Sequence, residues 1–255
     1  MLPVKEILLQ SGRLLRRHPV LVLPVVAGAL SFQISMGGQG SASLPIIVAF
    51  WLLDLALTAG LLSMIRSYHQ AEASGWDAFL IGIGRYFTPI LTGSLVQLGL
   101  VFLTLVPILA LLKTSVGIPD IKPLMNGVIP TPEQADQIGQ WTAALVAWGA
   151  VWGIVYFFLA LWKQVIVVQG TSWLQAWKAS ASIVRGHWLH ITAILTLQGL
   201  GLAFGAAPVL ARMDGLSELG AVVMLLVNCY FSVVMMVVLL GPAQLPNSEN
   251  VDAAA

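Results

Sequence analysis

One stretch, residues 173–211, decides the fold of this chain; it reads WLQAWKASASIVRGHWLHITAILTLQGLGLAFGAAPVLA. Within it, mostly apolar residues recur at the helical spacing i, i+3, i+4, i+7, i+10 and i+11: Trp173, Ala176, Trp177, Ser180, Ile183 and Val184. This spacing places them in one stripe along an α-helix. Arg185 and Trp188 mark the end of the stripe, and an apolar run of membrane-spanning length follows. The stretch predicts an amphipathic helix that leads directly into a transmembrane helix.

The same template fits two earlier parts of the chain. Near the N-terminus it fits Val4, Ile7, Leu8, Ser11, Leu14 and Leu15. Farther along it fits Trp76, Phe79, Leu80, Ile83, Tyr86 and Phe87. Ser11 in the first stripe occupies the same place as Ser180 in the third. We therefore predict three repeat units, at about residues 3–72, 73–170 and 171–243, each an amphipathic helix followed by a transmembrane hairpin.

The composition indicates a membrane protein. Hydrophobic residues make up 58% of the chain and charged residues only 9%, against about 25% charged residues in a soluble domain. The mean hydropathy is +0.89. We predict an all-α polytopic fold with six transmembrane helices near residues 19–36, 44–65, 89–112, 139–162, 187–211 and 219–242. Residues 1–246 would form a single membrane domain, and residues 247–255 a disordered C-terminal tail.

The charged residues predict an orientation. In a six-span chain, nine basic residues fall on one side of the membrane: Lys5, Arg13, Arg16, Arg17, Arg66, Arg85, Lys163, Lys178 and Arg185. Only Lys113, Lys122 and Arg212 fall on the other side. The positive-inside rule then places both termini and the three amphipathic helices in the cytoplasm, as expected for a bacterial inner-membrane protein.

The same cytoplasmic face predicts a lipid interface. Basic residues at a membrane surface attract anionic head groups, and Trp side chains favour the boundary between membrane and water. The residues expected to do so are Arg13, Arg16, Arg17, Arg85, Lys178, Arg185, Trp173 and Trp177. Nucleic acid is not expected as a partner, because these residues lie at the membrane and leave no soluble basic surface.

A layer of polar side chains is predicted at mid-membrane depth. Asp54 is expected to be the one formal charge at that depth, and an unpaired charge there is costly. Polar neighbours in the same layer are Thr58, Gln97, Gln198 and Asn228. We expect Asp54 to point inward with at least one amide within reach. Three roles remain open for this cluster: hydrogen bonds between helices, transport or proton handling, and contact with a partner's membrane helix.

The sequence contains no recognisable catalytic motif. Phosphate-binding loops, nucleophile elbows and zinc-protease helices are all absent, so we predict that the protein is not an enzyme. His187 and His190 have a spacing that one metal ion could bridge, but interfacial histidines more often anchor a helix. The single Cys229 excludes an intrachain disulfide. No metal and no cofactor is predicted.

Two segments resemble a known group of membrane proteins. Residues 7–19, which read ILLQSGRLLRRHP, and the following LVLP at residues 21–24 form the first segment. The second runs from Ser172 to Arg185. Both resemble segments of the YciC-type bacterial inner-membrane proteins and of the membrane domain found with some glycerophosphodiester phosphodiesterases. The resemblance implies a polytopic helical membrane domain; the phosphodiesterase activity does not carry over, because the catalytic barrel is missing.

The function expected from these features is non-enzymatic. Small loops, absent catalytic motifs and amphipathic helices at the cytoplasmic face favour an accessory, scaffold or assembly subunit of a membrane complex. Its partners would be membrane lipids and other membrane-protein subunits. The alternative is a transporter or channel-like protein for a lipid or small amphiphile, with Asp54 in the pathway.

Overall fold

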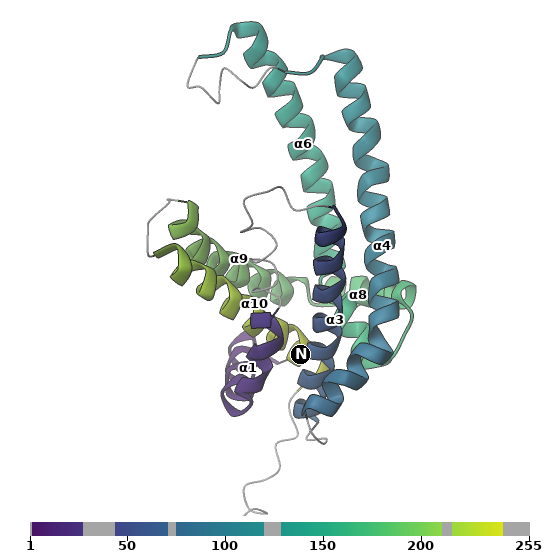
Figure 1. Cartoon of the computed structure of the whole chain (residues 1–255), viewed down its shortest axis with the longest axis vertical. Helices are drawn as coiled ribbons and strands as arrows, with labels where there is room; N and C mark the ends of the chain where they lie inside the picture. The colour runs from purple at the N-terminus through teal and green to yellow at the C-terminus, as the bar shows by residue number, and fades with distance from the viewer. Residues whose placement is uncertain (1, 28–43, 71–74, 120–128, 211–215, 242–255) are drawn as a thin grey trace, which may run out of the picture. The chain divides into compact units, whose positions relative to one another are not determined.

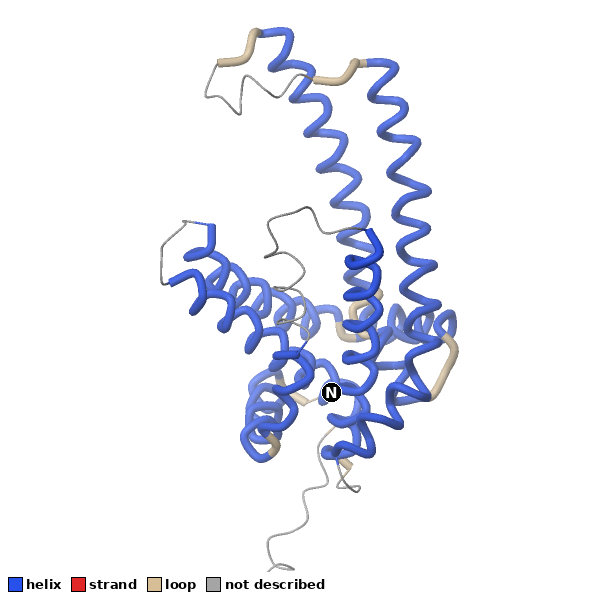
Figure 2. The backbone as a smooth tube through the Cα atoms, viewed as in Figure 1, coloured by secondary structure: helices blue, strands red, loops and turns tan. Residues whose placement is uncertain are grey.

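The structure, a computed structural model, describes residues 2–27, 44–70, 75–119, 129–210 and 216–241 (Figure 1). These residues are almost entirely helical, and no strand occurs among them (Figure 2). Five of the described segments are long and apolar enough to cross a membrane: Leu44–His69, Gly75–Ser115, Pro132–Gln169, Trp188–Ala207 and Val222–Leu240. Only helices and closed barrels satisfy their backbone polar groups inside a bilayer. The chain is therefore a helical membrane protein.

The described elements are, in chain order, α1 (Val4–Arg17), the 3-10 helix η1 (Pro19–Val22), α3 (Leu44–His69), α4 (Gly75–Ser115), α6 (Pro132–Phe158), α7 (Trp162–Gln169), α8 (Trp173–Gly186), α9 (Trp188–Leu210) and α10 (Leu216–Leu240). Five predicted spans correspond to the five long apolar segments. The remaining predicted span, near residues 19–36, continues into residues outside the described ranges, as does the predicted tail at 247–255. A sixth span and the threefold repeat stay predictions.

The start of α6 shows how local sequence sets a helix boundary. Thr131 is the N-cap residue, and its hydroxyl accepts a hydrogen bond from the Gln134 backbone N–H at 3.3 Å. The Gln134 side chain accepts a hydrogen bond from the Thr131 N–H at 3.0 Å, which completes a capping box. Pro132 occupies the first helical position, where a missing N–H costs nothing. The start of α6 therefore follows from residues 131–134 alone.

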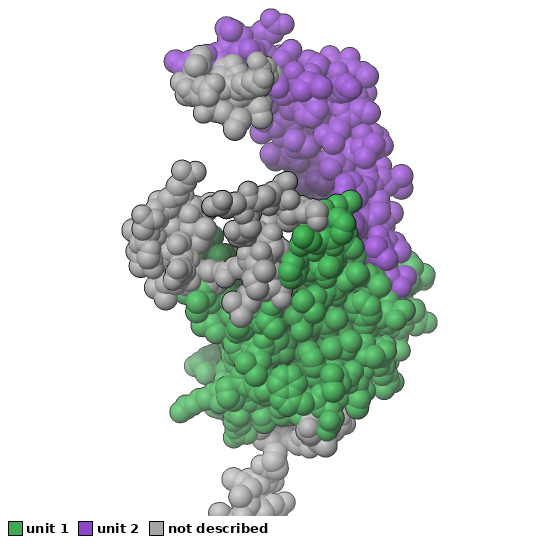
Figure 3. All heavy atoms as spheres, viewed as in Figure 1, with its two compact units in different colours: residues 1–91, 161–255 green, residues 92–160 purple. Residues whose placement is uncertain are grey.

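The chain divides into two compact units (Figure 3). Unit 1 comprises residues 1–91 and 161–255, and unit 2 comprises residues 92–160. Within the described part of unit 1, large side chains that are fully buried come from seven elements: Ile7, Leu21, Leu62, Ile90, Ile166, Ile191 and Met236. Unit 2 contains the later part of α4 and helix α6, and α6 has no buried residue.

The first and third amphipathic stripes face the core of unit 1. Ile7 and Ser11 are buried on α1, and Ala176, Ser180 and Val184 are buried on α8. A buried hydroxyl is costly unless it is hydrogen-bonded. The Ser11 hydroxyl donates to the Ile7 carbonyl at 2.8 Å, and the Ser180 oxygen accepts from the Leu161 N–H at 3.2 Å. The two polar exceptions in the sequence pattern are therefore satisfied core residues.

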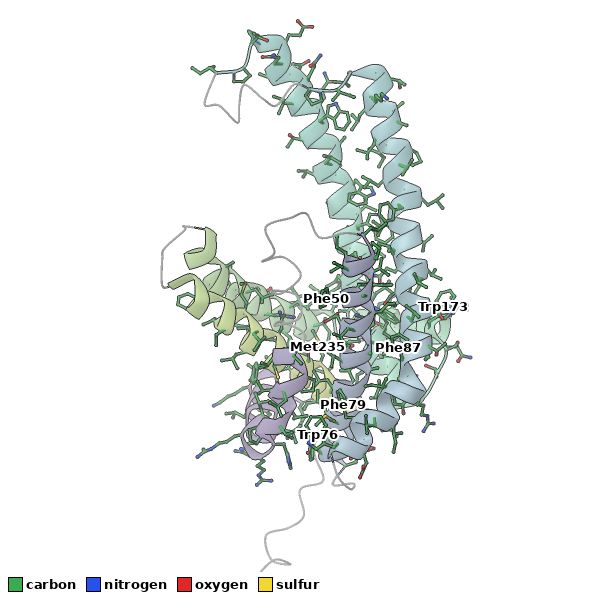
Figure 4. All side chains as sticks on the ribbon, in the orientation of Figure 1. Phe50, Trp76, Phe79, Phe87, Trp173 and Met235 are labelled. Carbon is green, nitrogen blue, oxygen red and sulfur yellow. The ribbon has the colours of Figure 1, made fainter. Side chains whose placement is uncertain are left out.

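The second stripe is rotated from its predicted position. Phe79 and Tyr86 are buried as expected, but Trp76 and Leu80 are exposed by 49% and 66%. The rings of Trp76 and Phe79 lie edge to face, with centroids 5.6 Å apart (Figure 4). The rotation follows from Gly82, because a Cβ there would lie 2.9 Å from the carbonyl oxygen of Ala59. Glycine lets the start of α4 approach α3 this closely, so the glycine faces the contact.

Helices α9 and α10 form a close antiparallel pair, side by side in Figures 1 and 2. A Cβ added to Gly201 would lie 3.1 Å from Val227, and one added to Gly205 would lie 2.7 Å from Met224. Small residues allow membrane helices to approach closely where lipid supplies no hydrophobic driving force. Gly201 and Gly205 therefore lie at a contact between two helices of the same chain.

Candidate functional site

The predicted polar layer centres on Asp54 of α3. The Asp54 side chain is exposed in unit 1, whereas its neighbour Leu55 is only 2% exposed. Thr58, one turn farther along, is half-buried. We predicted that Asp54 points inward, whereas its side chain is exposed at the surface of unit 1.

Lys163 lies on α7, a helix of unit 1 that packs against α3. Its ammonium lies 5.8 Å from the centroid of the Trp162 ring, a cation–π distance. The linear pattern ended the fourth span at residue 162 and so counted Lys163 outside the membrane. The turn at residues 159–161, after which the chain returns as a separate helix, is what brings Lys163 toward α3.

Two of the predicted amides meet. The Gln198 side chain of α9 donates to the Asn228 side chain of α10 at 3.5 Å. Gln97 belongs to unit 2, is 7% exposed, and its amide nitrogen has no hydrogen-bond partner in the described structure. The structure therefore pairs two of the predicted amides, Gln198 and Asn228, with each other. The single five-residue cluster stays a prediction.

Arg66, near the end of α3, connects three helices of unit 1. One guanidinium nitrogen donates to the Val167 carbonyl of α7 at 2.7 Å and to the Tyr86 hydroxyl of α4 at 3.3 Å. A second nitrogen donates to the Gln70 side chain at 3.0 Å. The last carbonyls of a helix have no hydrogen-bond partner within the helix, and they carry a partial negative charge. An arginine at that end supplies both a hydrogen-bond donor and a positive charge. From the sequence, Arg66 was recognisable only as one of the nine basic residues predicted on the cytoplasmic side.

The residues predicted at the lipid interface are exposed or half-buried. All six basic side chains are exposed: Arg13, Arg16, Arg17, Arg85, Lys178 and Arg185. Trp173 and Trp177 are half-buried, with ring centroids 5.1 Å apart, and Trp177 also packs edge to face on Trp162. On α1 and α8 the charges therefore lie off the buried stripe. Contact with lipid itself stays a prediction.

The N-terminal segment packs within unit 1, where it contacts α10 and α3. The Tyr230 hydroxyl of α10 donates to the Leu8 carbonyl at 2.8 Å. His18, just after α1, stacks on Tyr68 of α3 with centroids 3.9 Å apart. Burial, and secondarily the charge of Arg17, lowers the pKa of His18 below its ordinary value of 6.5. The docked helix therefore favours a neutral imidazole.

Metal-ligating residues do not gather in the described ranges. The rings of His187 and His190 lie edge to face with centroids 6.4 Å apart. No group of three or more His, Cys, Asp or Glu side chains suited to a metal ion occurs in the described part of the chain.

No known protein family, curated protein or solved structure matches this chain. The resemblance to YciC-type proteins therefore stays an expectation. What the fold and its residues establish is the class: a helical membrane protein with at least five candidate spans.

Proposed function

We propose that the protein is a non-enzymatic accessory, scaffold or assembly subunit of a complex in the bacterial inner membrane, with both termini in the cytoplasm. It contacts anionic lipids through its amphipathic helices and other subunits through its membrane-spanning surface. The orientation rests on the positive-inside rule.

The observation that carries the proposal is the surface of α6. This 27-residue helix has no buried residue, and its large side chains include Val146, Val151 and Ile154, exposed by 65%, 59% and 61%. Its indole N–H groups are already used, because Trp148 and Trp152 donate to the Thr104 hydroxyl at 3.1 and 2.9 Å. A helix whose outer face is apolar and whose Trp148 and Trp152 indoles are already hydrogen-bonded offers contact area to another membrane helix.

The outer face of α6 also allows close approach by another membrane helix. Gly149 and Gly153 form a Gly-x-x-x-Gly pair, and a Cβ on either would meet no atom within 4 Å. Such pairs let helix backbones pack closely in a bilayer. The surface of α6 is therefore where a partner subunit is expected to bind.

The test is purification of the full-length protein from native membranes in lipid nanodiscs. We expect a partner subunit at fixed stoichiometry, lost when Gly153→Leu places a bulky side chain on the α6 face. Gly199→Leu is the matched control, because Gly199 is also an open glycine, on α9 of unit 1. A homogeneous protein without any stoichiometric partner would overturn the proposal. A partner retained by both variants would move the contact away from α6.

A further inference from the structure

Helix α1 has a buried inner face and a basic outer face. Ile7 and Ser11 are buried on the inner face. The residues of the outer face are exposed, and they are Lys5, Glu6, Leu9, Arg13, Arg16 and Arg17. Residues 5, 9, 13 and 16 are spaced by three or four, so they lie on one side of the helix. With four basic residues and one acidic residue, this outer face has a net charge of +3.

Three of these charges lie close together at the end of α1. Arg13, Arg16 and Arg17 fall within about 6 Å along the helix axis, at 1.5 Å per residue. Like charges three or four residues apart repel one another on a helix surface. Within the described part of the chain, none of the three guanidinium groups has an ion-pair or hydrogen-bond partner. The cluster is therefore suited to a negatively charged ligand.

The arginine end of α1 lies level with the end of a membrane span. His18, directly after α1, stacks on Tyr68, with ring centroids 3.9 Å apart. Tyr68 is the last residue but one of the candidate span Leu44–His69, which has 26 residues. Such a helix is about 39 Å long, close to the roughly 40 Å of a bilayer with its head groups. Its last turn therefore reaches the layer that contains the lipid phosphates, and the arginine cluster lies beside it.

The outer face of α1 also carries an apolar side chain, because Leu9 is 50% exposed. The inner face is held against another candidate span, since the Tyr230 hydroxyl of α10 donates to the Leu8 carbonyl at 2.8 Å. Arginine together with exposed leucine is typical of helices that lie at a membrane surface. This composition favours a phospholipid over a soluble anion, because a phospholipid offers an apolar chain next to its phosphate.

Helix α8 occupies the corresponding place in the third stripe but lacks such a cluster. Ser180 is buried on α8 as Ser11 is on α1. The basic residues Lys178 and Arg185 are exposed, but they are seven residues apart, about 10 Å along the helix axis. Helix α1 therefore has the denser positive charge of the two.

We propose that the outer face of α1 binds the phosphate head groups of anionic phospholipids through Arg13, Arg16 and Arg17, and that bound lipid stabilises α1. The inference rests on the proposed function and deepens it, because it assigns the selective contact with anionic lipids to one helix. Arginine suits this ligand, since its planar guanidinium group can donate two parallel hydrogen bonds to one phosphate. Bound phosphates also offset the repulsion among the three arginines.

The experiment measures amide hydrogen exchange of residues 4–17 in the full chain, in two kinds of nanodisc. One contains only phosphatidylcholine, and the other contains equal parts of phosphatidylcholine and phosphatidylglycerol. We expect exchange in α1 to be about tenfold slower or more with phosphatidylglycerol, because each basic residue near an anionic surface adds attraction. Salt at about 1 M shortens the screening length to about 3 Å and should remove the difference.

Variants assign the effect to the arginine cluster. Replacing Arg13, Arg16 and Arg17 together by Gln should make exchange equal in the two nanodiscs, whereas replacing all three by Lys should retain most of the difference. The matched single variants are Arg16→Gln, expected to reduce the difference severalfold, and Lys113→Gln, expected to leave it unchanged. Lys113 is exposed and lies on α4, on the side of the membrane predicted to be opposite α1. If the triple Gln variant is not recovered in folded form, these two single variants decide.

Three results would overturn the proposal. The first is equal exchange of wild-type α1 in both nanodiscs, and the second is an undiminished difference in the triple Gln variant or in Arg16→Gln. The third is equal protection by glycerol phosphate added to phosphatidylcholine nanodiscs, which would make the ligand a free phosphate. Residues 173–186 of α8 serve as the internal reference, and protection there as large as in α1 would contradict the assignment to α1. The purified protein is tested without a partner subunit, so this proposal and the α6 contact can fail independently.

Discussion

Unit 1 and unit 2 are stabilised in different ways, although both consist of apolar membrane helices. In unit 1, fully buried side chains such as Leu62 and Met236 pack between helices, and polar contacts such as Arg66–Val167 connect the helix ends. In unit 2, α6 buries no residue, and its indoles donate hydrogen bonds to Thr104 of α4 and to the Gly117 carbonyl just after α4. Apolar composition alone therefore does not reveal which part of a membrane protein has a core.

The largest expected difference between the units comes from equal truncations. Leu62→Ala in unit 1 should lower the free energy of unfolding by about 2–3 kcal/mol, because it leaves a cavity in a packed site. Lipid tails are as apolar as leucine, so the loss is mainly one of packing contacts. Leu103→Ala in unit 2 removes a side chain that is 70% exposed and should cost less than about 0.5 kcal/mol. Thermal unfolding in detergent measures both, and equal losses would contradict the contrast.

A second comparison uses two glycines of α4 that are two residues apart. Gly82→Ala should destabilise unit 1 by about 1–2 kcal/mol, because the added Cβ would press on Ala59 and Ser63 of α3. Gly84→Ala meets no atom within 4 Å and should be neutral or stabilise the helix by up to about 1 kcal/mol. Opposite signs in the same unfolding assay would confirm that the second stripe faces α3 through Gly82. A neutral Gly82→Ala variant would count against that contact.

Unit 2 can be tested through its hydrogen bonds. Thr104→Val removes the acceptor shared by the Trp148 and Trp152 indoles and should weaken the α4–α6 hairpin by about 1 kcal/mol. Thr114→Val is the control, because that hydroxyl donates only to carbonyls of its own helix, at Ala110 and Leu111. Tryptophan emission and the indole N–H signals in NMR report the change. Unchanged indole signals in Thr104→Val would show that these bonds do not hold the hairpin.

Periodicity predicted much of this fold because apolar spacing depends only on neighbours in the chain. It located helices at residues 4–17 and 173–186, and it placed Ser11 and Ser180 on the buried stripes. The capping box at the start of α6 is equally local, because it joins residues only three apart in the chain. The orientation of the second stripe could not be predicted in this way. It depends on the contact of Gly82 with Ala59 and Ser63, which lie on α3.

The candidate site was less predictable than the fold. Asp54 was recognisable, since a carboxylate in an apolar run is costly wherever it lies. The separate helix α7 that carries Lys163 was not, because the turn at residues 159–161 interrupts a run of apolar sequence without any glycine or proline. Arg66 likewise has a partner 101 residues away, and no spacing rule connects it to Val167.

The smallest predicted effect concerns pH and the docking of α1 on unit 1. The pKa of His18 is lowered from 6.5 in the folded protein, so the unfolded chain binds more protons as the pH falls through that value. The neutral His18–Tyr68 stack thus contributes its full stabilisation above about pH 6.5. This contribution decreases as the pH falls from there to the lowered pKa of the folded protein.

His18→Phe keeps a ring to stack on Tyr68 but cannot titrate. We expect the unfolding midpoint of the wild type to fall between pH 7.5 and 5 relative to that of the variant, as measured by thermal unfolding in these buffers at fixed salt. Parallel pH profiles for the two proteins would show that α1 is held by Ile7 and Tyr230 alone and that the histidine stack adds nothing.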